Sequence, residues 1–521
     1  MRKFLLLVAL FIGGLAAFAA SDVNADQQKA LTNIQRSMDI LDAVWSTSIK
    51  GGKANLYMAD TYDTSNHTAS GPSDVWPYTA AIEAHCSLLE ALALVKDLAP
   101  ELYAANYDKY LGQLEVLIDN LEFYRGTYSR PSYATGSQQW SPFAVPRASQ
   151  RGAADVSGIL NVYDDQMWLA RELVRAYRLT NKSEYLDEAT YLVDYSLDGW
   201  DCWRDDDGNE YGGITWGPGY NSKHACSNAP IIQPLVWLYD IYKDSVATVD
   251  YYYRDENNAV KSVTRTRAEH YLDFAAKIYD WQKRNLLHSS GVYWDMMGAD
   301  NTIQIKRGYR QHVDCGAPTG SFISYNTGTM IAGAVELFKA TGDDSYKSDI
   351  DATAKAALSK FAKYVRKVGG YDFYTDERAT GGFNTWFNDV LIRAYVDAYP
   401  HCGNTAPQSA INGMQATLDY AFVNHNRSNL LPIHLVDGWG DETITKGFHQ
   451  CAFASEYAII AVWLLTKDNK GAAVAPVIAD SSSNPSVYTL TGVRLGFLDE
   501  VKSSLASGLY IVGNHKVYIS R

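Results

Sequence analysis

Apolar side chains recur along most of the chain with the spacing of an α-helix. Between residues 26 and about 467, apolar positions follow an i, i+4, i+7, i+8 pattern, as in Leu169, Leu173, Ala176 and Tyr177. This spacing places apolar side chains on one face of a helix. Strict alternation of apolar and polar residues, which is typical of half-buried strands, is nearly absent over this range. We predict about twelve helices, which begin near residues 27, 77, 106, 165, 184, 228, 265, 321, 345, 384, 408 and 449.

A weak internal repeat groups these helices into pairs. Residues 175–189 and 336–346 each contain a helix end, a short turn with Asn, Gly or Asp, and a new helix that opens with Tyr. Self-similar helical hairpins stack into open solenoids or close into toroids, and six hairpins would close an (α/α)6 barrel. Long loops alternate with the short turns and hold residues 51–76, 125–162, 198–227, 289–320 and 369–383. Because long ordered loops on one side of a scaffold usually carry function, we favour an all-α (α/α)6 barrel over the solenoid.

The N-terminus is typical of a secretory signal peptide. A basic start, Arg2 and Lys3, precedes an apolar run to residue 18, and Ala-Phe-Ala at 17–19 offers a cleavage site. The run is short and polar sequence follows it, so we predict a signal peptide at residues 1–20 and an exported protein. No cysteine of the lipoprotein type follows the run, and no later segment is apolar for long enough to suggest a membrane span. The expected location is periplasmic, cell-surface or extracellular.

The composition changes after the last helical segment. We predict a helical domain at residues 26–467, a Gly/Ala/Ser/Pro-rich linker at 468–486 and a small β module at 487–521 whose last two strands turn at Gly513 and Asn514. This tail resembles the C-terminal sorting or attachment modules of proteins secreted by Bacteroidetes-type bacteria. A small β appendage without a sorting role is the alternative.

Charge narrows the class of partner. The formal net charge is -13, which disfavours nucleic acid and anionic membrane surfaces because both attract basic patches. A neutral polymer such as a glycan is compatible with this charge. Aromatic residues make up 13% of the chain, including 37 Tyr and 13 Trp. Most of these rings must be core, but flat rings also stack on the C–H faces of sugars.

The cysteines and histidines do not indicate a metal or cofactor. None of the six cysteines forms a CxxC pair or has metal-ligand spacing with a histidine. We therefore predict no metal site and no cofactor. The pairing of the cysteines stays open, since a large core does not need disulfides for stability.

Two adjacent carboxylates open one of the predicted helices. Asp164 and Asp165 follow Tyr163 and precede Trp168, whereas the other adjacent aspartates, at 205–207 and 343–344, are typical of solvated turns. Adjacent Cα atoms lie ~3.8 Å apart, and diverging side chains set the carboxyl groups roughly 5–6 Å apart. A retaining glycosidase uses a similar spacing of ~5–5.5 Å, whereas an inverting one needs ~6.5–9.5 Å.

The pair also has an ordinary structural interpretation. Aspartate is a common N-cap and a common first-turn residue of helices. A cap needs only one carboxylate, however, and two like charges at this distance raise one pKa and so supply a protonated acid. The positive end of the helix dipole favours the ionised form of the other.

Several short motifs follow one another in a specific order along the chain. Over residues 26 to about 467 the chain resembles glycoside hydrolase family 76, the bacterial endo-α-1,6-mannanases. The resemblance rests on Tyr-Asp-Asp-x-x-Trp at 163–168, Ala-Tyr-x-x-Thr at 176–180, Gly-Gly-Ile-x-Trp at 212–216, Lys223 with Ser-Asn-Ala-Pro at 227–230, and Tyr-Asn-x-Gly at 325–328. The chain departs from the usual pattern in a longer insertion at 251–264, in Cys226, and in Thr327.

This resemblance implies a fold, an activity and a set of site residues. The family has an (α/α)6 barrel, which agrees with the helix count. Carried over by position, Asp164 becomes the nucleophile and Asp165 the acid/base, with net retention. The implied substrate-binding residues are Trp76, Tyr163, Trp216, Tyr325 and Asn326. Trp76 and Tyr325 fit equally well as core aromatics.

Three hypotheses follow. The first is a secreted hydrolase that cleaves internal α-1,6 bonds of mannan, with a polysaccharide as partner and without nucleic acid or membrane insertion. The second is another (α/α)6 enzyme acting on a different sugar, such as a uronide hydrolase or a sugar epimerase, which would need a His or Arg constellation; the histidines here are scattered. The third is a glycan-binding surface protein without turnover. The two adjacent carboxylates favour the first hypothesis, because a pure binder of neutral sugar gains nothing from them.

Overall fold

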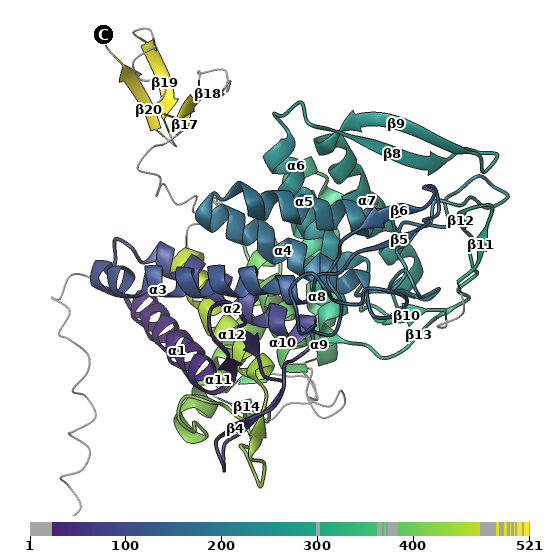
Figure 1. Cartoon of the computed structure of the whole chain (residues 1–521). Coiled ribbons are helices and arrows are strands. Elements are labelled where there is room, and N and C mark those ends of the chain that lie inside the picture. The colour runs from purple at the N-terminus through teal and green to yellow at the C-terminus, as the bar shows by residue number, and fades with distance from the viewer. Residues whose placement is uncertain are drawn as a thin grey trace, which may run out of the picture.

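A computed structural model describes residues 23–298, 303–361, 367–368, 371–372, 384–468, 486–488, 494–497, 501, 505, 508–512 and 515–519. The predicted signal peptide, most of the loop at 369–383, most of the linker and the turn at 513–514 lie outside these residues. The described part contains twelve α-helices (Figure 1). The first six are α1 (Ala25–Thr47), α2 (Val75–Leu94), α3 (Pro100–Asp119), α4 (Tyr163–Thr180), α5 (Ser183–Leu197) and α6 (Ile232–Tyr242). The others are α7 (Arg267–Leu286), α8 (Ser324–Thr341), α9 (Asp344–Phe361), α10 (Asn384–Ala398), α11 (Ala406–Asn424) and α12 (Gly447–Thr466).

The observed helices follow the predicted ones in number and order. The largest difference is at α3, which begins at Pro100 rather than near residue 106. Proline is well suited to the first helical position because its fixed φ matches the helix and its missing N–H would be unpaired there anyway. The first turn of α3 is largely exposed, so the apolar spacing does not reveal it.

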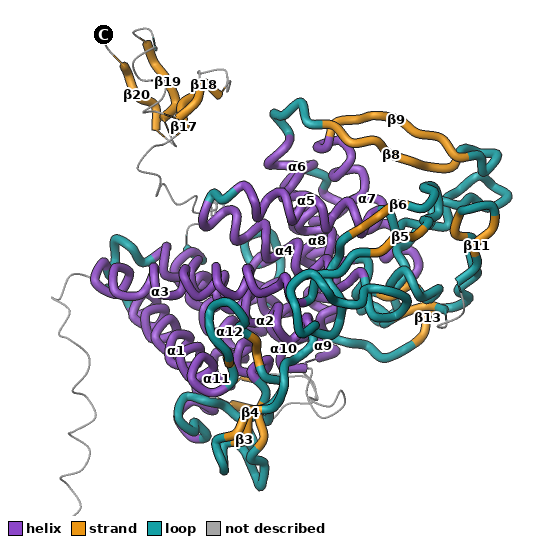
Figure 2. The backbone as a smooth tube through the Cα atoms, in the orientation of Figure 1, coloured by secondary structure: helices purple, strands orange, loops and turns teal. Residues whose placement is uncertain are grey.

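The even-numbered helices form a closed inner ring. Each contacts the next, from α2 through α4, α6, α8 and α10 to α12, and α12 returns to α2. The odd-numbered helices pack outside this ring, for example α1 against α12 and α2, and α5 against α4. This closure confirms the predicted (α/α)6 barrel and excludes an open solenoid (Figure 2).

Helix α12 shows how burial shapes the sequence of an inner helix. By length and composition Gly447–Thr466 would suffice to cross a bilayer, which corrects the expectation that no segment after the signal peptide is long and apolar enough. The apolar stretch is 83% buried inside the protein. Its contacts with α1, α2 and α10 account for its hydrophobicity, because an inner helix is covered on all sides.

The long loops contain short strands. In the N-terminal half they are β1 (Ile49–Lys50), β2 (Tyr57–Met58), β3 (Tyr62–Asp63), β4 (Thr68–Ala69), β5 (Tyr128–Arg130), β6 (Gln138–Trp140), β7 (Lys223–His224), β8 (Thr248–Arg254) and β9 (Val260–Thr266). Next come β10 (Met296–Met297), β11 (Ile305–Lys306), β12 (Tyr309–Arg310), β13 (Pro318–Thr319), β14 (Lys367–Val368), β15 (Tyr371–Asp372) and β16 (Ile444–Thr445). The C-terminal strands β17 (Ser486–Tyr488), β18 (Arg494–Phe497), β19 (Gly508–Val512) and β20 (His515–Ile519) form one antiparallel sheet in the order β18-β17-β19-β20.

The β8–β9 hairpin is the longest strand pair in the helical region. It occupies the insertion noted in the sequence and pairs Thr248 with Thr266 through to Arg254 with Val260. Burial alternates along β8, but the inward residues are only partly covered until Arg254. The alternation therefore carries little apolar contrast in the sequence, which is why no strand was expected there.

Candidate active site

The two adjacent aspartates lie at the beginning of inner helix α4. The helix starts at Tyr163 directly after Val162, whose side chain provides no cap. The Tyr163 N–H donates instead to the backbone carbonyl of Trp216 at 2.8 Å. The Asp165 N–H donates to Asp164 Oδ1 at 3.0 Å. One carboxylate thus takes part in satisfying the free N–H groups of the first turn, while the other is left for a different role.

Asp164 is partly exposed and accepts several hydrogen bonds. Trp216 Nε1–H donates to its Oδ2 at 3.4 Å, and the Cys226 thiol donates to the same carboxylate. Burial of the carboxyl group raises the pKa of Asp164 to about 6. These donors, together with the Asp165 N–H, limit the rise because they stabilise the charged form.

Asp165, unlike Asp164, is buried and lies near like charges. It is 6% exposed. Burial, the charge of Asp164 and the charge of Asp74 all raise the pKa of Asp165 well above its usual value. Of the two carboxyl groups, that of Asp165 therefore keeps its proton to a higher pH than that of Asp164.

A second aspartate pair in the same chain provides a contrast. Asp343 and Asp344 also stand at a helix start, that of α9, but both are exposed. Hydrogen bonds from Ser345 lower the pKa of Asp343. Burial is therefore the largest cause of the raised pKa values at α4, and the charge of Asp164 adds to it at Asp165.

The loop that carries Trp216 depends on a glycine, Gly213, for its shape. Gly213 has a φ of +78°, and a Cβ there would lie 2.4 Å from the ring of Trp281. Only glycine fits such a position, since it combines a left-handed backbone with a close approach. Nearby, the buried Lys223 Nζ bonds Asp201 Oδ2 at 2.8 Å. This ion pair anchors the loop that returns from Trp216, whose ring stacks on His224 with centroids 4.8 Å apart.

Two residues that the sequence analysis did not single out as site residues complete the polar site. The thiol of Cys226 lies between Asp164 and Tyr325 and is hydrogen-bonded to both. Asp295 is a third, partly exposed carboxylate whose pKa is raised by burial, and it accepts from Asn326 Nδ2 at 3.4 Å. Asp295 has no acidic neighbour in the sequence, so no carboxylate pair marks it as a site residue. The aromatic residue before it is the sequence feature that could have drawn attention to this position.

Aromatic side chains from four inner helices meet beside the dyad. The half-buried Trp76 stacks on Phe387 with centroids 5.9 Å apart and contacts Phe448 edge-on at 5.1 Å. Tyr325 lies 4.5 Å from Phe387, centroid to centroid. Because these residues stand at the starts of α2, α8, α10 and α12, the N-terminal ends of the inner helices converge here. Trp168, in the second turn of α4, joins the cluster through Trp386, with ring centroids 4.6 Å apart.

Two of the predicted substrate-binding residues are fully buried. Tyr163 is 0% exposed and its ring lies against Gly199, where a Cβ would be 2.6 Å from the tyrosine ring. Its side chain is core, and the residue serves the site through its backbone. Asn326 is also 0% exposed, and its Nδ2 donates to Asp295. Of the other candidates, Trp216 and Trp76 are partly exposed and Tyr325 is 7% exposed.

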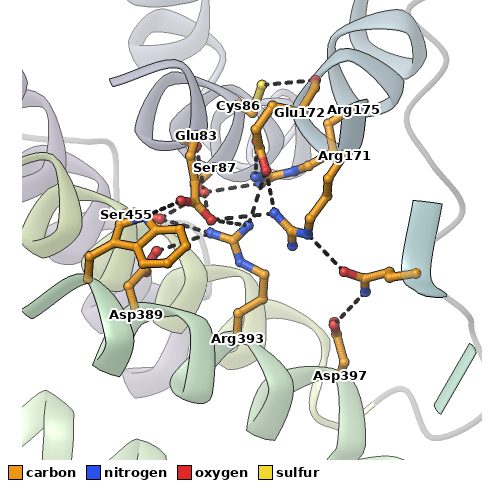
Figure 3. Close-up of polar contacts among 12 residues, drawn as sticks. Glu83, Cys86, Ser87, Arg171, Glu172, Arg175, Asp389, Arg393, Asp397 and Ser455 are labelled. Carbon is orange, nitrogen blue, oxygen red and sulfur yellow. Dashed lines mark hydrogen bonds and ion pairs between the residues drawn. The ribbon is translucent and has the colours of Figure 1, made fainter. Parts of the chain in front are cut away.

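Buried charges tie the inner helices together in the barrel interior (Figure 3). Arg393 of α10 bonds Glu83 of α2 at 2.9 Å, and Arg175 of α4 donates to Ser87 of α2 at 3.0 Å. Glu83 also accepts from Trp386 Nε1–H at 2.7 Å. A cavity of about 20 Å³ lies among Glu83, Arg171 and Arg393 and has room for about one water. The network links the helices whose starts form the site.

The described residues contain no group of three His, Cys, Asp or Glu side chains placed to hold a metal ion. All six cysteines are free thiols, and all lie within the described residues. The polar groups at the site are Asp164, Asp165, Asp295 and the hydrogen-bonding groups around them.

Comparison with known proteins identifies the family. The model of glycosyl hydrolase family 76 matches residues 153–250 and 259–396. These ranges include both aspartates, Trp216, Cys226 and Asp295. No curated protein matches the chain.

Solved structures share the fold. A family 76 mannosidase from Bacteroides thetaiotaomicron has a TM-score of 0.59 at 18% identity, over 84% of this chain and 100% of that one. An inactive variant of an α-1,6-mannanase from Salegentibacter sp. HEL1_6, with α-1,6-mannotetrose bound, has a TM-score of 0.53 at 18% identity, over 83% and 99%. Dfg5 from Chaetomium thermophilum, with glucosamine bound, has a TM-score of 0.50 at 14% identity, over 86% and 92%. With its (α/α)6 barrel and its match to the family model, the chain belongs to glycosyl hydrolase family 76.

Proposed function

We propose that the protein is an exported glycoside hydrolase that cleaves internal α-1,6-mannosidic bonds of mannan with retention of configuration. Asp164 acts as the nucleophile and Asp165 as the general acid/base. The observation that carries this proposal is the adjacent pair itself, placed at the start of an inner helix in a family of glycoside hydrolases, with environments that separate the two pKa values.

A relative supports both the dyad and the substrate. The Salegentibacter mannanase variant is inactive after two consecutive aspartates are replaced by alanine, and it binds α-1,6-mannotetrose. Asp164 and Asp165 are consecutive and lie within the residues matched by the family model. A pair of the same type in the same fold argues for the same chemistry here.

The roles follow from exposure and charge. Asp164 is the more exposed carboxylate and receives hydrogen bonds that keep it ionised, as a nucleophile requires. Asp165 is buried beside a like charge and holds its proton, as a general acid requires. Asp165 gives that proton to the glycosidic oxygen while Asp164 attacks the anomeric carbon, and a glycosyl ester forms on Asp164. Asp165 then takes a proton from water, which attacks the ester and releases the sugar with its original configuration.

Trp216 and the three-carboxylate arrangement favour a neutral sugar at this site. The Trp216 indole bonds Asp164 and is partly exposed, so its ring can cover the apolar face of a sugar next to the nucleophile. A uronide would bring a carboxylate next to Asp164, Asp165 and Asp295, and the repulsion between like charges would oppose it.

Product analysis on linear α-1,6-mannan tests the proposal with wild type, Asp164→Asn and Asp165→Asn. Wild type should release short oligosaccharides of mixed length, and each variant should lose activity by at least about a thousandfold. Asp344→Asn is the matched control, because it alters an adjacent aspartate pair at a helix start that is exposed. Intact polymer with all four proteins, despite binding, would favour a glycan-binding protein; turnover of another glycan by wild type would point to a different sugar.

Export is supported by the sequence of residues 1–20 and the C-terminal strands. A basic start followed by a short apolar run is typical of a cleaved signal. Mass determination of the mature N-terminus, combined with cell fractionation, distinguishes periplasmic, surface and extracellular locations. An uncleaved protein in the cytoplasm would contradict export.

A further inference from the structure

A second cavity lies beside the outer layer of the barrel, with a volume of about 600 Å³. Its walls come from residues 132–140, the end of α5 and the β8–β9 hairpin, with Tyr309 closing one side. Figure 2 shows these strands and helix α5 in the same part of the molecule. Ligand pockets in proteins measure about 300–1,000 Å³, so this cavity has the size of a binding site.

The cavity is distinct from the aspartate site. Neither aspartate of the dyad, nor Trp216, nor Tyr325 lines it. Residues 132–140 precede the ranges matched by the family model, and Tyr251 and Tyr252 fall in the gap between them. Part of the wall therefore lies outside the residues that the family model matches.

Two wall residues carry polar groups that call for a partner. Trp140 is 7% exposed, and its Nε1–H has no hydrogen-bond acceptor among the described residues. The hydroxyl of Tyr251 likewise meets no partner within the described part of the chain. Both atoms are enclosed by surrounding side chains, so they are unpaired polar groups within the wall rather than groups that the cavity presents to a ligand.

Two of the three lining carboxylates are paired with arginines, which narrows the class of ligand. Asp194 pairs with Arg267 at 2.8 Å, and Asp198 lies 3.5 Å from Arg130 Nη2. None of the lining residues is Lys or Arg. Burial, followed by the charge of Arg265, lowers the pKa of the lining His270 to about 3, so this imidazole is neutral. An anion therefore finds no cation among the lining residues, and the imidazole adds no positive charge.

The remaining accessible groups suit a carbohydrate. Tyr252 is 45% exposed and presents an aromatic ring, and Gln138 is exposed and both donates and accepts hydrogen bonds. Rings bury the apolar C–H faces of a sugar while amides and hydroxyls bond its hydroxyl groups. We propose that this cavity is a second carbohydrate-binding site that holds neutral sugar residues of a polymeric substrate away from the Asp164–Asp165 site. The choice of a mannan oligosaccharide as its ligand rests on the proposed function.

Hydrogen–deuterium exchange on the full chain tests this site. The Asp164→Asn variant, which should not turn over substrate, is incubated with α-1,6-mannotetraose and compared with the free variant. We expect protection at residues 163–168 and, separately, at 132–140 and 248–254. Adding Tyr252→Ala and Gln138→Ala should lower the affinity for the cavity site by about tenfold and remove protection there only. Tyr420→Ala, on α11 and 40% exposed, is the matched control.

Each outcome decides between the two proposals. Protection at both places, with the second lost in the double variant, supports the cavity site. Protection at 163–168 alone overturns it and leaves the proposed function standing. Protection at the cavity alone supports the second site and counts against mannan cleavage at the dyad. Protection at neither place overturns both. Because Tyr252 and Gln138 are surface residues, a circular dichroism spectrum like that of the parent is expected for the variants.

Discussion

At the scale of single residues, the two adjacent aspartates differ in burial and in hydrogen bonding. Asp164 keeps partial exposure and three donors, whereas Asp165 is covered and faces only like charges from Asp164 and Asp74. In the exposed pair at Asp343 and Asp344, hydrogen bonds from Ser345 lower the pKa of Asp343. The pair at Asp164 and Asp165 is thus suited to proton transfer, whereas the pair at Asp343 and Asp344 is an ordinary helix start.

These environments predict the pH dependence of catalysis. Cleavage needs Asp164 ionised and Asp165 protonated, so kcat/KM should follow a bell-shaped curve. Activity falls as pH drops through about 6, where Asp164 gains a proton, and falls again at higher pH as Asp165 loses its own. Steady-state rates from pH 4 to 9 check this. An acid limb near pH 4, the ordinary value for a carboxyl group, would contradict the raised pKa of Asp164.

Cys226 provides a test of one hydrogen bond. Cys226→Ala removes a donor from Asp164, destabilises the carboxylate and moves the acid limb to higher pH. A hydrogen bond to a charged group contributes about 1.5–3 kcal/mol, less for a thiol, so activity at pH 6 should fall roughly three- to tenfold. Cys226→Ser keeps a donor and should leave the limb in place or lower it. If both variants moved the limb equally, the thiol would act only through packing.

At the scale of elements, the site is assembled where the N-terminal ends of the inner helices meet. Long loops lead into these ends and supply Trp216, Cys226 and Asp295, while the helices supply the aspartate pair and Tyr325. The loops hold fixed shapes because glycines allow close approach, as at Gly213.

Gly213→Ala tests this element-level requirement. The substitution imposes a left-handed φ on alanine and places its Cβ 2.4 Å from the Trp281 ring. We expect destabilisation by at least about 2 kcal/mol and a loss of activity, because the displaced segment carries Trp216. Gly71→Ala is the matched control, since a Cβ there meets nothing within 4 Å. Thermal unfolding and mannan hydrolysis measure both effects; equal behaviour of the two variants would refute the steric account.

At the scale of the whole molecule, the barrel is closed by apolar packing and pinned by a buried ionic network. Arg393 reaches Glu83 across the interior, and its Nη2 is within 3.4 Å of Asp389. Burial raises the pKa of Asp389 to about 8 even beside this arginine. Such groups are stable only as a set, because removing one partner leaves another charge uncompensated in the interior.

Arg393→Met tests the network. Loss of the guanidinium leaves Glu83 without one of its cations, and the free energy of unfolding should fall by about 3–5 kcal/mol. Lys243→Met is the control and removes a surface partner of Asp240, in a pair whose side chains are about half exposed. This variant should change the free energy of unfolding by less than about 1 kcal/mol. Urea unfolding followed by fluorescence compares the two. Similar midpoints for both variants would mean that the network contributes specificity rather than stability.

Local patterns in the chain determined the helices, their order and the aspartate pair. Apolar spacing depends only on neighbours within a few turns, and it predicted all twelve helices of the described part. The (α/α)6 closure, which the contacts confirm, was predicted from the repeat, the long loops and the family resemblance. The dyad was visible because its two members are adjacent. The motifs around it led to the family that the comparison confirms.

Only the tertiary structure decided which side chains face the site. Tyr163 and Trp216 are both aromatic residues in family motifs, yet one is fully buried against Gly199 and the other is half-exposed beside Asp164. Cys226 and Asp295 join the site from separate loops, and Arg393 meets Glu83 across 310 positions of sequence. Exposure, pKa and ion pairing depend on contacts between residues distant in the chain, and no local pattern encodes those contacts.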